Sequence, residues 1–154
     1  QSHKDEATLM AQMTQRISGN KPLTLEQFGA QAKSALDSKN YAELLNISGA
    51  FLENRPRHKA ALKYKYLASV ALADHSRRNR DLSAAIRHID AAQVIRAGGL
   101  KVSPVKADKV RDALATDLDM EGRRLQNTDI DKAIGLWTKA LSYDPELTST
   151  AATK

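Results

Sequence analysis

Apolar residues recur every three or four positions along most of the chain, which is the spacing of one face of an α-helix. The first segment shows this simply, because Leu9, Met13 and Ile17 stand four residues apart. Such patterns predict seven helices, over residues 4–18, 24–37, 41–53, 57–74, 81–96, 105–125 and 130–143. The alternation that is typical of strands never persists, so the chain is predicted to be all-α.

Local signals mark where several of these helices begin and end. Thr24 and Gln27 have the spacing of a capping box, in which each side chain accepts a hydrogen bond from the other residue's backbone N–H. Ser103 followed by Pro104 predicts an N-cap with proline at the first helical position. Glycines 98–99 predict a helix end. The resulting connections are short, which favours antiparallel neighbouring helices.

The segment 57–74 is apolar on almost every side of the predicted helix. A helix of this kind is buried on several sides, so we expect it to be central to the fold. The segment 75–80 that follows is polar and rich in arginine, and it is predicted to be a loop.

The second helices of successive pairs share a spacing of small and large residues. A small residue is followed by a large one four positions on, a small one three further and a proline five further. The complete copy is Ala133, Trp137, Ala140 and Pro145; the partial copies are Ala85, Ile89 and Ala92, and Leu44, Ser48, Phe51 and Pro56. The small residues let a neighbouring helix approach and the large one fills the space beside it.

This pattern resembles the tetratricopeptide repeat family. The resemblance implies antiparallel helix pairs stacked as a short right-handed superhelix, here with an extra N-terminal helix. The expected organisation is an N-terminal helix and linker over 1–22, three pairs within 23–145 at 25–56, 57–97 and 104–145, and the start of a capping helix over 146–154. Only the first pair keeps the repeat of roughly 34 residues, so a divergent helical-hairpin array of another family stays open.

The composition of the 154 residues excludes several classes of protein. Apolar residues make up 42% and charged residues 27%, which is ordinary for a soluble globular domain. There is no cysteine, which excludes disulfides, thiolate metal sites and cysteine nucleophiles. No apolar run is long enough to span a membrane. The polar N-terminus predicts no signal peptide, and the lack of cysteine is compatible with a cytoplasmic or a periplasmic location.

The sequence holds no constellation that carries catalytic chemistry. None of the four histidines has a metal-binding partner at helical spacing. Asp117, Asp119 and Glu121 alternate, but residues two apart on a helix point away from each other. Nucleotide-binding and hydrolase motifs are also absent from the sequence. We therefore expect no enzymatic activity, no metal and no cofactor.

The formal net charge of +6 is unevenly distributed. Residues 55–111 contain fourteen lysines and arginines against four aspartates, whereas the flanks are mildly acidic. A basic region attracts phosphates, anionic membranes or acidic peptides, although charges of this kind also solvate ordinary helices. Nucleic-acid or anionic-surface binding is therefore an alternative function. The densest basic run, predicted to be in a loop, is Arg77, Arg78 and Arg80.

The resemblance implies a non-catalytic scaffold or adaptor that holds a peptide or partner protein in a concave groove lined by the first helix of each pair. Three cations expected in this groove, Lys33, Lys65 and Arg123, favour an acidic peptide or a C-terminal carboxylate as the ligand. The full set of expected partner-binding residues is Lys33, Lys65, Tyr66, Ser69, Asp119, Arg123 and Gln126. Neither the identity of the partner nor the oligomeric state follows from the sequence.

Overall fold

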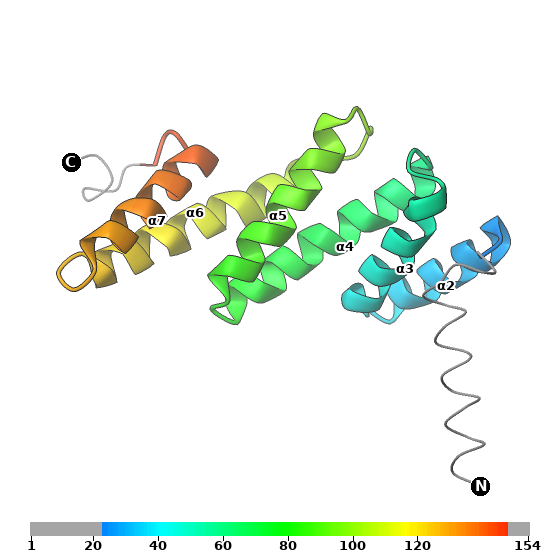
Figure 1. Cartoon of the computed structure of the whole chain (residues 1–154), viewed down its shortest axis with the longest axis horizontal. Helices are drawn as coiled ribbons and strands as arrows, with labels where there is room; N and C mark the ends of the chain where they lie inside the picture. Colours follow the sequence, from blue (N-terminus) through cyan, green and yellow to red (C-terminus); the bar gives the residue numbers. More distant parts are fainter. Residues whose placement is uncertain (1–22, 148–154) are drawn as a thin grey trace, which may run out of the picture. The chain divides into compact units, whose positions relative to one another are not determined.

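A computed structural model describes residues 23–147 of the chain, and this part is all-α, as predicted (Figure 1). It contains six helices and no strand within these residues. The helices are α2 (Leu25–Asp37), α3 (Tyr41–Asn54), α4 (Lys59–Arg78), α5 (Leu82–Ala97), α6 (Val105–Leu125) and α7 (Ile130–Tyr143). The helix predicted over 4–18 and the capping segment predicted beyond 147 lie outside the described residues.

The chain divides into two compact units, residues 1–65 and residues 66–154. The division falls inside α4, the segment that is predicted from its apolar pattern to be central to the fold. The first part of α4 therefore belongs with α2 and α3, and the rest belongs with α5, α6 and α7.

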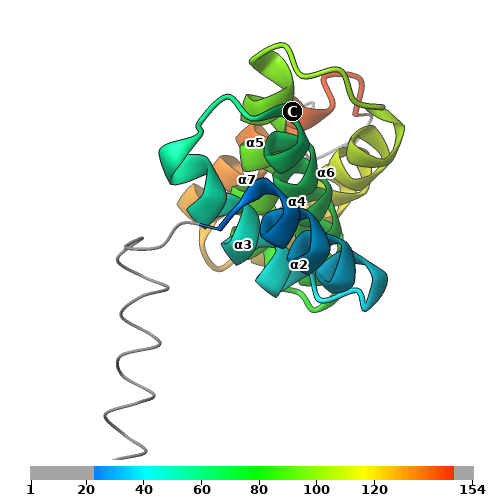
Figure 2. The same ribbon diagram turned by 90° about the vertical axis from the view of Figure 1, so that its right-hand side faces the viewer.

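Unit 1 is built around the hairpin of α2 and α3, which lie side by side (Figure 2). The rings of Phe28 and Phe51 stack with centroids 4.2 Å apart, and the Tyr64 ring meets Phe28 edge-on at 5.8 Å. The predicted capping box is present, since Thr24 Oγ1 accepts from the backbone N–H of Gln27 and the Gln27 side chain accepts from that of Thr24. The aromatic rings thus pack α2 against α3 and Tyr64, and the capping box determines where α2 begins.

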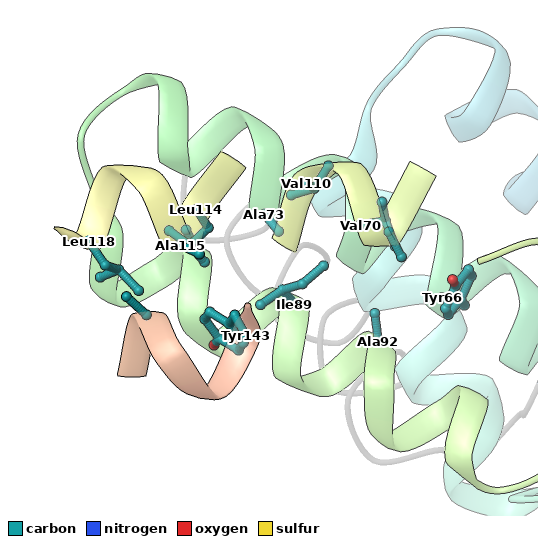
Figure 3. Packing of buried hydrophobic residues seen from close by; sticks show 13 residues of the cluster. Tyr66, Val70, Ala73, Ile89, Ala92, Val110, Leu114, Ala115, Leu118 and Tyr143 are labelled. Carbon is teal, nitrogen blue, oxygen red and sulfur yellow. The ribbon is translucent and has the colours of Figure 1, made fainter. Parts of the chain in front are cut away.

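The core of unit 2 lies between the second part of α4 and the three helices that follow it. Figure 3 shows side chains from α4, α5, α6 and α7 pointing toward one another. The cluster consists of Tyr66, Val70, Ala73, Ala85, Ile89, Ala92, Ala107, Val110, Leu114, Ala115, Leu118, Ala140 and Tyr143. Six of these thirteen side chains are alanines, so the helices approach closely where they meet.

The hairpin of α6 and α7 is held by a contact between a glycine and the only tryptophan. The indole of Trp137 lies against Gly122, where an added Cβ would stand 2.7 Å from Cδ1 of the ring. Its Nε1–H donates a hydrogen bond of 3.3 Å to the backbone carbonyl of Asp119. Trp137 is half-buried and packs between helices, as expected for the large residue of the repeated pattern.

One predicted loop and one predicted helix cap are wrong. The segment 75–80 is not a loop, because α4 continues to Arg78 and only a short turn precedes α5. Asp74 forms ion pairs with Arg77 and Arg78, and cations are favoured in the last turn of a helix. The helix predicted over 105–125 is α6, but its N-cap is Pro104 and not Ser103. The backbone N–H of Val105 donates to Ser103 Oγ at 3.4 Å.

A polar contact joins α5 to α7 beside the core of unit 2. Tyr143 Oη donates a hydrogen bond of 2.8 Å to Asp90, and the Lys139 ammonium lies 3.0 Å from the same carboxylate. Lys139 Nζ also stands 4.7 Å from the centre of the Tyr143 ring. Burial, followed by the hydrogen bond to Asp90, raises the pKa of Tyr143 well above its usual range.

This contact predicts how alkali acts on the protein. In the unfolded chain the phenol loses its proton near its usual pKa of about 10, whereas the folded protein keeps it. The Tyr143 contribution to stability is thus complete below about pH 10 and is lost as the pH rises further. Tyr143→Phe should cost about 1 kcal/mol at neutral pH. Urea midpoints measured up to pH 11 should fall less steeply for this variant than for the native chain; parallel curves would contradict the assignment.

Candidate interaction surfaces

Three of the residues predicted to contact a partner in the groove are buried. Tyr66 is 3% exposed and belongs to the core of unit 2, where its hydroxyl donates to the Ser103 carbonyl at 3.3 Å. Ser69 is fully buried, and Asp119 is 5% exposed. Predicting these side chains as partner contacts is wrong, because the spacing along a helix defines a face without specifying what covers it.

The other four predicted groove residues reach the surface to different extents. Lys33, Arg123 and Gln126 are exposed, and Lys65 is half-buried. Nη2 of Arg123 lies 3.4 Å from Oδ2 of Asp119, so this cation already interacts with a carboxylate of its own helix. Their role in binding a partner stays a prediction.

The arginine run that follows the core part of α4 is mostly engaged in ion pairs. Arg77 donates to Asp117 on α6 at 3.0 Å and to Asp74 at 3.1 Å, and it joins the two helices. Burial alone would lower the pKa of Arg77, but the hydrogen bonds to Asp117 and Asp74 outweigh it and the pKa is raised. Arg78 pairs with Asp74, whereas Arg80 is exposed in the turn, at φ 66°. The run therefore has a structural role in α4 and its contact with α6.

The basic region 55–111 separates into two parts that differ in charge compensation. Beyond Asp74, several arginines face carboxylates: in addition to the pairs of Asp74, Arg96 and Arg111 share Asp108, at 3.5 and 3.3 Å. The stretch 54–73, in contrast, contains five lysines and arginines and no carboxylate. The positive charges of the stretch 54–73 are therefore not offset by any carboxylate of the same stretch.

Three exposed cations at that place define what we call the α4 cation patch: Arg57, Lys59 and Lys63. Lys59 and Lys63 are four residues apart and lie on one side of the helix. None of the three forms an ion pair with a carboxylate among residues 23–147. The first turn of α4 contains no acidic residue either, so positive side chains stand at the positive end of the helix dipole.

Apolar side chains remain partly exposed along one side of α7. Ile130 and Ile134 are each 50% exposed, and Trp137 and Leu141 continue the same side at helical spacing, half-buried. We call these four residues the α7 face. Ala133, Ala140 and Tyr143 are buried in unit 2 and lie on the adjoining side of α7. A surface helix normally exposes polar residues outside its buried stripe, so apolar side chains that extend beyond that stripe are unusual.

Among residues 23–147 no group of three or more His, Asp or Glu side chains could hold a metal ion. Within the same range, no helix is long and apolar enough to cross a membrane.

Two surface features were missed by the analysis of the sequence, although each has a signal there. The stretch 54–73 lacks carboxylates, which can be read from the sequence without a structure. The apolar residues of 130–143 cover about half of the helix circumference, more than one packing stripe needs. Comparisons with protein-family models, with curated proteins and with solved structures found no match to this chain.

Proposed function

We propose that this protein is a non-catalytic interaction module, a scaffold or adaptor whose helical hairpins bind a partner protein or peptide. The arrangement of small and large residues in its helices resembles tetratricopeptide repeats, and arrays of that kind function through surfaces that their helices present. The proposal does not depend on the family, because any array of helical hairpins offers such surfaces.

The observation that supports the proposal most is the α7 face. Units of a helical array bury their apolar faces against neighbouring units. Ile130 and Ile134 are half-exposed next to Trp137 and Leu141, so α7 presents apolar surface beside its buried residues. Contiguous exposed apolar residues with a polar rim are typical of sites where another protein binds.

Replacing both isoleucines by glutamine tests the proposal. Ile130→Gln with Ile134→Gln should leave the urea midpoint nearly unchanged, since exposed substitutions shift stability by about 0.5 kcal/mol or less. The immobilised native chain should retain a defined set of proteins from a lysate of the source organism, identified by mass spectrometry. We expect the double variant to lose that set.

The matched control changes two exposed valines that lie in the same unit but outside the α7 face. Val94 and Val105 are 72% and 57% exposed and lie on α5 and at the start of α6. Val94→Gln with Val105→Gln should retain the same proteins as the native chain. Equal capture by all three proteins would contradict a role of the α7 face, and equal loss in both variants would indicate nonspecific adsorption.

Nucleic-acid or anionic-surface binding through the basic region is the alternative, and the α4 cation patch is what favours it. The region is less available than its composition suggests, because Arg77, Arg78, Arg96 and Arg111 already face carboxylates. Single-strand recognition also uses exposed aromatic rings. Tyr66 is buried and Tyr64 packs against Phe28, which makes this alternative the weaker one.

A further inference from the structure

We propose that the α4 cation patch binds an acidic segment of a partner protein, through ion pairs of Arg57, Lys59 and Lys63 with consecutive or near-consecutive Asp and Glu side chains. The inference rests on the proposed function, because an acidic segment is one class of protein partner. It adds a second binding site, which recognises its partner by charge, whereas the α7 face offers only apolar contacts.

The α4 cation patch has an electrostatic cost within unit 1. Like charges four residues apart on a helix repel each other, and cations near a helix N-terminus oppose its dipole. Arg57, Lys59 and Lys63 combine both effects, and no carboxylate among residues 23–147 compensates them. An incoming anion would relieve the repulsion and meet exposed ammonium and guanidinium donors, so the patch matches an acidic ligand in charge.

Three arginines on either side of the patch differ from it because each has a structural partner. Arg55, two residues before Arg57, is engaged: its guanidinium carbon lies 4.7 Å from the centre of the Phe51 ring and its Nη1 donates to the Leu23 carbonyl at 3.4 Å. Arg77 and Arg78, at the other end of α4, are paired with Asp74. Arg55 before α4 and Arg77 and Arg78 at its end thus have structural partners, while the cations of the patch remain available to a ligand.

The size and surroundings of the patch favour a short acidic peptide over a nucleic acid. Lys59 and Lys63 are about 6 Å apart along the helix axis, a span that a few peptide side chains can cover. A specific nucleic-acid complex commonly neutralises about six to ten phosphates, and the patch has three exposed cations. Tyr64, the aromatic residue next to Lys63, packs edge-on against Phe28, so it is not free to stack on a base.

The test uses the full chain and two fluorescent peptides, one with a run of glutamates and one with glutamines in the same places. Fluorescence anisotropy should show binding of the glutamate peptide only, weakening as salt is raised. The triple variant Arg57→Gln, Lys59→Gln, Lys63→Gln should bind it about tenfold more weakly, the combined effect of three exposed ion pairs. Its helical circular dichroism should be unchanged, since these side chains have no ion pair to lose.

The control removes the same charge elsewhere. Lys101, Lys106 and Lys109 are exposed and form no ion pair among residues 23–147. Lys101→Gln with Lys106→Gln and Lys109→Gln should bind the glutamate peptide nearly as the native chain does. Equal weakening of both triple variants would overturn the inference in favour of nonspecific attraction by net charge, and so would native affinity in the patch variant.

A further arm separates an acidic protein segment from a nucleic acid. An oligonucleotide with the same number of charges should bind more weakly than the glutamate peptide. Tighter binding of the oligonucleotide, lost in the patch variant, would overturn the acidic-peptide assignment. Failure of the peptide to bind, together with capture of proteins that depends on the α7 face, would refute the inference and leave the proposed function standing. If the native chain retained no proteins from the lysate, the proposed function would be refuted instead.

Discussion

Phe28→Ala is expected to lower the free energy of unfolding by about 3–5 kcal/mol, the usual cost of removing a large aromatic side chain from a core. Phe28 is 1% exposed. Its ring stacks on Phe51 and meets Tyr64 and His58 edge-on, with centroids 5.8 and 6.3 Å away. Alanine would leave a cavity at the point where α2, α3 and the start of α4 meet. Urea unfolding followed by circular dichroism measures the loss.

The control for this prediction lies one turn earlier on the same helix. Leu25 is also a large apolar residue of α2, but it is 58% exposed. Leu25→Ala should change stability by about 0.5 kcal/mol or less, because little buried surface is lost. A cost of Phe28→Ala as small as that of Leu25→Ala would show that the aromatic cluster does not organise unit 1.

Gly122→Ala is expected to destabilise the protein by about 1–3 kcal/mol, the range for overpacking a well-filled core. In an ordinary helix interior the same change stabilises by about 1 kcal/mol, because alanine is the better helix former. Here the sign is reversed, since the added Cβ would overlap the Trp137 indole. To remove this overlap the indole ring has to move outward, and that movement breaks the hydrogen bond from Trp137 Nε1 to the Asp119 carbonyl.

Fluorescence reports this change directly, because Trp137 is the only tryptophan in the chain. The emission maximum of the Gly122→Ala variant should shift to the red as the indole becomes more exposed, and the urea midpoint should fall. Gly135→Ala is the matched control on the neighbouring helix, since no atom lies within 4 Å of its added Cβ. It should stabilise by about 0.5–1 kcal/mol. A stabilised Gly122→Ala variant would contradict the described packing of α6 on α7.

The helices themselves follow from the sequence because their signals are local. The capping box of Thr24 and Gln27 and the aspartate N-caps of α5 and α7 involve residues three apart, so they are visible before any folding is considered. The all-α class and the small residues at close helix contacts, such as Ala140, also follow from spacing along the chain. These features depend on the helix period alone.

Only the tertiary structure decides which side of a helix is covered and which charges meet. Arg77 looks like part of an open basic loop until α6 brings Asp117 to it, and Asp90 has no sign of a partner until α7 supplies Tyr143. Spacing placed Ser69 and Asp119 on a predicted groove, yet both are buried. The α7 face shows the reverse, since the apolar residues Ile130 and Ile134 share a helix with buried side chains and yet remain half-exposed. Periodicity states which side chains share a face, whereas burial and ion pairing depend on segments that are distant in the sequence and become neighbours only when the chain folds.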